Sequence, residues 1–145
     1  MVEEGKPAPD FELLTDEGER VKLSSFRGKP VVLYFYPRDD TPGCTKQACG
    51  IRDAYDAFEE RGAVVLGISS DTQASHVKFK AKYELPFTLL ADPDRTTGET
   101  YGVNRPESQA FERSTFVIDA DGNVVKVMRR VNPEKHADQV LAALP

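Results

Sequence analysis

Two runs of β-branched and aromatic residues, VVLYFY at 31–36 and AVVLGIS at 63–69, constrain the fold of this chain most strongly. Neither run alternates with polar residues, and Pro37 ends the first, so each predicts a strand buried in a sheet that is covered on both faces. The stretch between them, from Cys44 to Glu60, has apolar residues spaced three, four and three, at Ala48, Ile51, Tyr55 and Phe58. This spacing predicts an amphipathic helix, which Gly62 ends.

The remaining segments extend this strand and helix pattern toward both ends of the chain. Short strands are expected near 11–14 and 21–23, a helix over 72–82, and a short helix near 94–100. Two β-rich runs in 114–130 flank Asp121-Gly122, a pair suited to the positive φ angles of a tight hairpin turn, and Pro133 opens a last helix. The expected fold class is α/β, a thioredoxin-like sandwich with a mixed central sheet and helices on both faces.

Length and composition agree with one globular domain over residues 1–145. The formal net charge of −5 offers no footprint for nucleic acid or an anionic membrane, and the longest apolar stretches are far shorter than the ~20 residues of a membrane span. The N-terminus MVEEGKPAPDF has neither a basic nor an apolar signal region. A cytoplasmic protein is therefore expected, and in a reducing compartment a close pair of cysteines is more often reactive than structural.

The chemistry is expected in PRDDTPGCTKQAC, residues 37–49, where a buried strand ends and a helix begins. Cys44 falls in the first helical turn, with Thr41 or Asp40 as candidate N-cap and Pro42 at the first position. Free backbone N–H groups and the positive end of the helix dipole favour a thiolate there, and the thiolate is the nucleophilic form. Further positive charge is available from neighbours whose direction the sequence leaves open, namely Arg38, Lys46 and Arg52.

Cys49, the second cysteine, lies five residues after Cys44. On one α-helix, positions i and i+5 are about 140° apart in rotation and ~8.6 Å apart between Cα atoms, beyond the ~7 Å limit for a disulfide. A bond between the two sulfurs therefore requires this part of the helix to unwind. Cys44 shares the apolar stripe of the helix and Cys49 does not, so we expect Cys44 to face the protein body and Cys49 to lie nearer solvent.

At these residues the chain resembles the peroxiredoxins. PRDDTPGCT contains the Pro-x-x-x-Thr-x-x-Cys signature of that family, and YFYPRDDTPGCTKQACGIRD is similar to its PrxQ, or bacterioferritin comigratory protein, branch. GKPAPDF at 5–11 resembles the N-terminal pattern of the family, and RSTFVID at 113–119 resembles the segment that supplies its active-site arginine. The resemblance covers nearly the whole chain.

The resemblance implies a role for each matching residue. Cys44 corresponds to the peroxidatic cysteine, which becomes a sulfenic acid, and Arg113 to the arginine that stabilises the thiolate and polarises the peroxide. Thr41 corresponds to the hydroxyl that hydrogen-bonds cysteine and substrate, and Pro37 to the proline that shields the pocket. The N–H groups of Gly43 and Cys44 would hold a peroxide oxygen.

Cys49 matches a resolving cysteine that condenses with the sulfenic acid of Cys44. The resulting intramolecular disulfide would be reduced by a thioredoxin-like donor. The resemblance implies a thiol-dependent peroxidase for hydrogen peroxide and organic hydroperoxides, with no metal or organic cofactor. A monomer is the expected state, with a weak dimer as the alternative. The effect of the acidic pair Asp39-Asp40 within the motif is left open.

Two other functions fit a close cysteine pair. One is a thiol–disulfide oxidoreductase, which the Cys-x4-Cys spacing weakens because such enzymes use Cys-x-x-Cys. The other is a redox-sensing or chaperone-like binding module. A zinc site is disfavoured, since His76 and His136 lie far apart with no pairing pattern and are both expected at the surface.

Overall fold

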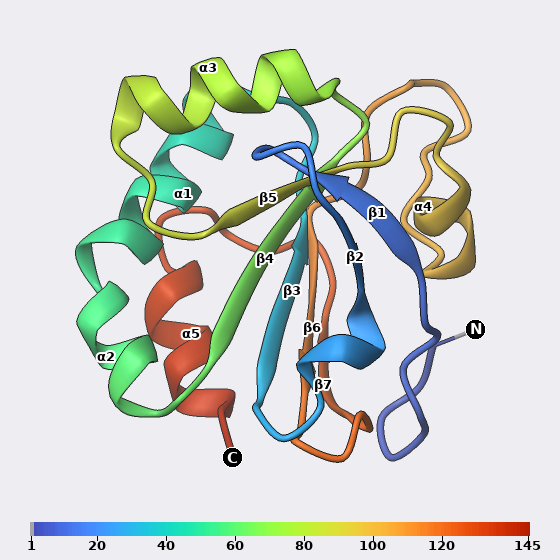
Figure 1. The fold of residues 1–145 in the computed structure, drawn as a ribbon, viewed down its shortest axis with the longest axis vertical. Helices are drawn as coiled ribbons and strands as arrows, with labels where there is room; N and C mark the ends of the chain where they lie inside the picture. Colours follow the sequence, from blue (N-terminus) through green and yellow to red (C-terminus); the bar gives the residue numbers. More distant parts are fainter. Residues whose placement is uncertain (1) are drawn as a thin grey trace.

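A mixed sheet of seven strands lies at the centre of the computed structural model, which describes residues 2–145 (Figure 1). The strands are β1 (Glu12–Thr15), β2 (Arg20–Lys22), β3 (Val31–Phe35), β4 (Val64–Ser69), β5 (Thr88–Ala91), β6 (Ser114–Ile118) and β7 (Val124–Met128). Their order across the sheet is β2-β1-β5-β4-β3-β6-β7. The central strands β3, β4 and β5 run parallel, and β1 and β6 flank them in the antiparallel sense.

Five α-helices of the described residues cover this sheet (Figure 1). They are α1 (Pro42–Asp53), α2 (Tyr55–Glu60), α3 (Gln73–Tyr83), α4 (Thr96–Thr100) and α5 (His136–Ala143), and a 3-10 helix, η1, spans Leu23–Phe26. The predicted thioredoxin-like arrangement, a mixed sheet with helices on both faces, is confirmed. No helix within residues 2–145 has the length and hydropathy needed to cross a membrane.

Strand β3 shows how the two faces of the sheet form two cores. All five of its residues are buried, and they alternate: Val31, Leu33 and Phe35 enter one core, while Val32 and Tyr34 enter the other. The first core is completed by η1, the chain near α4 and the N-terminal segment, and the second by α1, α2, α3 and α5. The uninterrupted apolar run of the sequence is therefore the mark of a strand buried on both sides.

Three local predictions differ from the structure. The helix expected over 44–60 is two helices, because the backbone of Ala54 leaves the helical region at φ −102° and ψ 11°. The turn between β6 and β7 is wider than expected: only Gly122 of the Asp121-Gly122 pair has a positive φ, of 89°, and the carboxylate of Asp119 accepts the N–H groups of Asp121 and Asn123. Finally, α5 begins at His136, three residues after Pro133.

Candidate active site

Cys44 lies in the first turn of α1, just beyond the carboxyl end of β3. Thr41 precedes the helix with extended backbone angles, φ −94° and ψ 157°, and Pro42 occupies the first helical position as predicted. The Cys44 side chain is only 1% exposed and packs in the core between α1 and the sheet. Because first-turn N–H groups have no acceptor inside a helix, the amides of Gly43 and Cys44 and the positive end of the dipole are available around the thiol.

Residues 37–41, here named the entry loop, connect β3 to α1. Pro37 and Thr41, two of the residues singled out in the sequence, are both half-buried in this loop. The Thr41 hydroxyl does not cap α1; it donates to the carbonyl oxygen of Arg38 at 2.9 Å. Its oxygen can still accept a hydrogen bond from a further partner.

Arg113 reaches the same helix end from the residue before β6, the strand next to β3. Ser114, the first residue of β6, pairs with Phe35, the last residue of β3. Arg113 comes just before Ser114 and therefore lies near the end of β3 from which the chain continues to α1. Its Nη2 lies 2.9 Å from the position that a Cβ on Gly43 would occupy. The missing side chain of Gly43 therefore allows the guanidinium to approach the backbone of the first turn.

Gln47 belongs to this site and was missed in the sequence. It is fully buried, and its Oε1 accepts a hydrogen bond from Nη1 of Arg113 at 2.6 Å. A contact of this kind fixes the direction of a guanidinium, whose donors form a rigid fork. The available signal was its spacing: positions i and i+3 lie on one side of a helix, so Gln47 had to lie near Cys44.

Cys49 lies in the same helix and is half-buried, so the expectation that it sits nearer solvent than Cys44 is confirmed. Both thiols are free. Since α1 is continuous from Pro42 to Asp53, the two cysteines are in the helical arrangement that separates their Cα atoms by ~8.6 Å. The disulfide expected between them requires the helix to unwind.

Two other cations near Cys44 have ion-pair partners of their own. Lys46 Nζ is paired with Glu134 at 2.9 Å, and Arg52 donates to the Asp53 carboxylate and to the Tyr83 carbonyl. Arg38 is exposed. Arg113 is thus the cation that the structure places against the first turn of α1.

Two neutral groups lie on the sheet side of this site. His136 is fully buried, and its Nε2 is 2.7 Å from the Thr115 hydroxyl. Burial, with the nearby Arg113 cation, lowers the pKa of His136 to about 3. Burial also raises the pKa of Tyr34, whose ring packs on His136 with centroids 5.5 Å apart, well above its usual value. Both groups are uncharged at neutral pH.

The prediction that His76 and His136 lie at the surface is wrong, since both are 0% exposed. Each has a partner in the interior that comes from a distant part of the chain, Asp39 for His76 and Thr115 for His136. These partners offset the cost of burying a polar ring.

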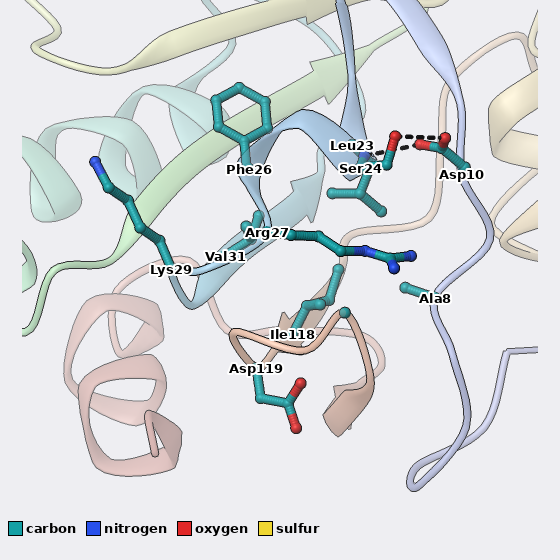
Figure 2. A pocket seen from close by; sticks show the side chains of 11 residues that line it. Ala8, Asp10, Leu23, Ser24, Phe26, Arg27, Lys29, Val31, Ile118 and Asp119 are labelled. Atoms are coloured by element: carbon teal, nitrogen blue, oxygen red, sulfur yellow. Dashed lines mark hydrogen bonds between the residues drawn. The ribbon is translucent and has the colours of Figure 1, made fainter.

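The cavity of Figure 2 lies on the other face of the sheet. It is lined by residues of the first core, Ala8, Leu23, Val31 and Ile118 among them, and by polar side chains including Asp10 and Arg27. Its volume of about 10 Å³ leaves room for about one water molecule at most. The cavity is thus separate from the core that contains Cys44.

A cysteine held at a helix start beside a fixed guanidinium is the arrangement of enzymes that use a thiolate as nucleophile. Comparison with known proteins gives the family. The model of the AhpC/TSA family matches residues 4–127. The peroxiredoxin Bcp of Bacillus subtilis is 46% identical over 149 residues, which cover 99% of this chain and 95% of the relative.

Solved structures agree with this assignment. The peroxidoxin BcpB of Mycobacterium tuberculosis superposes with a TM-score of 0.93 at 37% identity, over 99% of this chain and 96% of the other. The bacterioferritin comigratory protein of Xanthomonas campestris gives 0.87 at 35% identity, over 92% and 88% of the two chains. The chain belongs to the AhpC/TSA family, among the peroxiredoxins of the Bcp and peroxiredoxin Q branch. It is a peroxidase. This family membership favours the peroxidase over the thiol–disulfide oxidoreductase and the redox-sensing or chaperone-like module.

Proposed function

We propose that this peroxidase reduces hydrogen peroxide and organic hydroperoxides, with Cys44 as the residue that attacks the peroxide. One observation carries the proposal: the buried Cys44 thiol lies in the first turn of α1, where the Arg113 guanidinium packs against Gly43. The X. campestris relative is described in terms of alkyl peroxide reduction, which supports the substrate class.

In the first step, the Cys44 thiolate attacks the terminal oxygen of the hydroperoxide. A sulfur–oxygen bond forms as the O–O bond breaks, and the leaving oxygen departs with the electron pair and takes up a proton, giving water or an alcohol. The sulfur is oxidised to sulfenic acid. Negative charge grows on the leaving oxygen, and the Arg113 guanidinium with the amides of Gly43 and Cys44 would stabilise it.

The entry loop would complete the substrate pocket. The Thr41 hydroxyl donates its hydrogen bond to the Arg38 carbonyl, so its oxygen would accept a hydrogen bond from the O–H of the peroxide. Pro37 is half-buried in the same loop and would shield the reacting sulfur from water. Gln47 would hold Arg113 in the direction that this step needs.

In the second step, the sulfur of Cys49 attacks the sulfenic sulfur of Cys44. A disulfide forms and the hydroxyl leaves as water. The ~8.6 Å between the Cα atoms means that α1 must open between the two cysteines before they can react. Local opening of a helix whose outer side is solvated costs less than global unfolding.

In the third step, a thioredoxin-like protein would supply two electrons and regenerate both thiols by thiol–disulfide exchange. We propose this donor from the resemblance of the sequence, along with a single domain over 1–145, a cytoplasmic location and a monomeric state. A weak dimer is the alternative to the monomer, and sedimentation of the reduced and oxidised protein distinguishes the two.

Stopped-flow measurement of peroxide consumption with a thioredoxin recycling system tests the proposal. Cys44→Ser should abolish turnover. Cys49→Ser should keep the first oxidation of Cys44 at the rate of the unmodified chain and stop recycling by thioredoxin. Intact mass of the oxidised protein should show a loss of two hydrogens and no dimer. Turnover of Cys49→Ser at the full rate would refute the resolving role of Cys49.

A further inference from the structure

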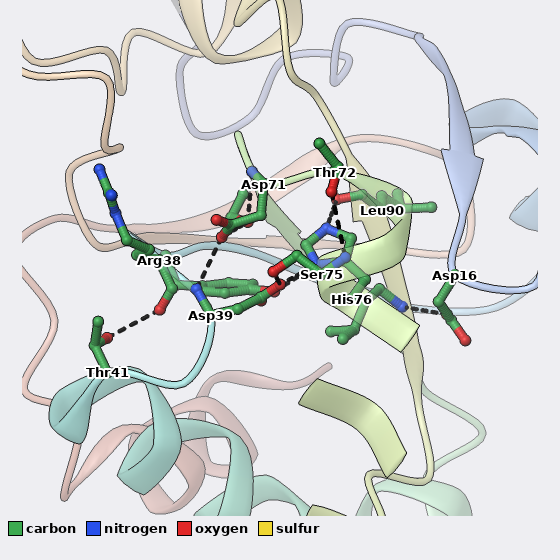
Figure 3. A network of polar contacts seen from close by, with 12 residues as sticks. Asp16, Arg38, Asp39, Thr41, Asp71, Thr72, Ser75, His76 and Leu90 are labelled. Atoms are coloured by element: carbon green, nitrogen blue, oxygen red, sulfur yellow. Dashed lines mark hydrogen bonds and ion pairs between the residues drawn. The ribbon is translucent and has the colours of Figure 1, made fainter. Parts of the chain in front are cut away.

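Asp39, in the entry loop, is buried among three donors (Figure 3). Its Oδ1 accepts the hydroxyl of Tyr36 at 2.6 Å, and its Oδ2 accepts the hydroxyl of Ser75 at 2.7 Å. The same Oδ2 lies 2.7 Å from Nδ1 of His76. The side chains of Asp39 and His76 are 4% and 0% exposed, so this pair is shielded from solvent.

The contacts of the ring define its protonation. Nε2 of His76 lies 2.8 Å from the carbonyl oxygen of Leu90, which can only accept, so Nε2 carries a hydrogen. One proton must also lie between Nδ1 and the Asp39 carboxyl group. Both oxygens of the Asp39 side chain already accept hydroxyl groups, so we assign this proton to the ring nitrogen. His76 is an imidazolium paired with a carboxylate.

We propose that the buried ion pair of His76 and Asp39 fixes the entry loop, which makes His76 a positioning residue for the reaction of Cys44. The inference rests on the proposed function. It assigns a role to the first of the two acidic residues in the motif, whose effect the sequence leaves open. His76 belongs to α3 and acts through the loop, without contact to the substrate.

Further contacts of the loop show that it is tied to the segment before α3. The backbone N–H of Asp39 donates to the carboxylate of Asp71 at 2.8 Å, and the Ser69 hydroxyl donates to the same oxygen at 2.7 Å. The loop leads directly into the helix, since the carbonyl of Thr41 accepts the N–H of Thr45 at 2.8 Å. A shift of Asp39 would therefore be passed to the first turn of α1.

Asp40, the second acidic residue, makes only surface contacts. Its carboxylate accepts hydrogen bonds from Lys82 at 2.8 Å and from the Tyr83 hydroxyl at 2.6 Å. The side chains of Lys82 and Asp40 are 59% and 41% exposed. An exposed pair of this kind contributes little. It supplies a matched control, because it joins the same loop to the same helix.

The groups around His76 also predict a pH dependence. The charged and titratable groups that face it from each neighbouring element are Asp39 of the entry loop, Asp71 after β4 and Tyr36 after β3. Burial alone would lower the pKa of His76, but the hydrogen bond and charge of Asp39, the Leu90 carbonyl and Asp71 together raise it. The ion pair is thus complete below this raised pKa and is lost as the pH rises through it.

The principal test compares the rate of Cys44 oxidation in His76→Gln and Lys82→Gln. Glutamine keeps a donor for Leu90 but cannot carry the charge. We expect His76→Gln to lower the second-order rate with hydrogen peroxide by ~10- to 100-fold, since small errors of placement have effects of this size. Lys82→Gln should change it by less than about fivefold. Alkylation of Cys44 by iodoacetamide, which needs no fixed peroxide site, should change much less than oxidation in His76→Gln.

The pH profile distinguishes a positioning role from damage to the fold, because damage to the fold would not make the effect of the substitution follow the protonation of His76. The ratio of the oxidation rates of the unmodified chain and His76→Gln should be largest at low pH and fall as His76 loses its proton. A ratio that is constant with pH would overturn the proposal. So would equal losses of peroxide and iodoacetamide reactivity, or oxidation of His76→Gln at the full rate.

A spectroscopic measurement on the unmodified chain keeps the proposal falsifiable if His76→Gln fails to fold. Long-range ¹H–¹⁵N correlation should show both ring nitrogens of His76 protonated at neutral pH, and a neutral ring would overturn the ion pair. Failure of the unmodified protein to consume peroxide would instead refute the proposed function. A reactive unmodified protein beside an equally reactive His76→Gln refutes the positioning role alone.

Discussion

Gly43 and Gly50 lie in the same helix but in very different surroundings. At Gly43, in the first turn, an added Cβ would come 2.9 Å from the Arg113 guanidinium. At Gly50, which follows Cys49 in the second half of α1, the nearest side-chain atom to an added Cβ is the Cβ of Ala137, at 4.0 Å. Gly43 makes room for the Arg113 guanidinium. Gly50 makes α1 less stable than it would be with alanine at this position.

The inner and outer contacts of α1 differ in the same way. Near Gly43, Gln47 holds Arg113 and is fully buried. On the outer side of the helix, Lys46 and Glu134 form an ion pair with side chains 60% and 65% exposed. Surface pairs contribute about 0–1 kcal/mol, whereas breaking a buried contact costs the desolvation of the group left behind. One helix thus combines an end fixed by buried contacts with an outer side held by weak surface contacts.

The largest expected effect falls on the fixed end. Arg113→Gln removes the cation and the fork of donors, and we expect the rate of Cys44 oxidation by peroxide to fall by ~10²–10³-fold, the usual loss for one donor at a developing negative charge. Arg20→Gln, an exposed arginine of β2, is the matched control and should react like the unmodified chain. Single-turnover stopped-flow measurement distinguishes them, and an unchanged rate for Arg113→Gln would remove the fixed end from the mechanism.

Acid should also weaken the fixed end, through His136. Its pKa is about 3 in the folded protein against 6.5 as an ordinary value, so the unfolded chain binds a proton that the folded chain does not between these pH values. The folded-state pKa is depressed, so the stability it provides is present above pH 6.5 and falls as the pH is lowered. At pH 5 the loss from this residue is about 2 kcal/mol.

His136→Asn tests this expectation by denaturant unfolding at several pH values. The cost of the substitution itself is the same at each pH, so the measured quantity is the slope of the unfolding free energy between pH 7 and 5, which should be shallower in the variant. Equal slopes would mean that His136 is protonated in the folded state, beside Arg113.

A smaller effect is expected from Gly43→Ala. The new Cβ would displace the end of the flexible Arg113 side chain, with no backbone atom in its way. The fold should be kept, with an unchanged or slightly higher melting temperature, while peroxide oxidation of Cys44 should slow by about tenfold. A variant that is both stable and fully reactive would show that the approach of Arg113 to the backbone is not needed.

The sequence predicts the backbone of this site better than its polar interior. Strands β3 and β4, the start of α1 and the burial of Cys44 follow from apolar runs, proline placement and helical spacing, which are local signals. The partners of the buried polar groups are not local: Gln47 bonds to a residue 66 positions away, and His76 to one 37 positions away. The sequence does not show these partners, and a histidine without a visible partner is expected at the surface.

The end of α1 shows the same limit for the backbone. The helix breaks at Ala54, where neither glycine nor proline gives a signal, and packing of α2 beside β4 accounts for the change of direction. The apolar spacing of the sequence continues across this break, because Ile51 of α1 and Phe58 of α2 pack in the same core.

Gly50→Ala should give the smallest effect and the most selective one. Alanine fits at 4.0 Å from Ala137 and stabilises a helix interior by up to about 1 kcal/mol, so opening of α1 becomes rarer by up to about fivefold. The first oxidation of Cys44 should keep its rate, while formation of the disulfide with Cys49, followed by rapid-quench mass analysis, should slow by that factor. Because Gly43→Ala is expected to slow the first reaction and leave the second, the two variants together separate the fixed end from the opening middle. Slowing of both reactions by Gly50→Ala would mean that the helix acts as one unit in both steps.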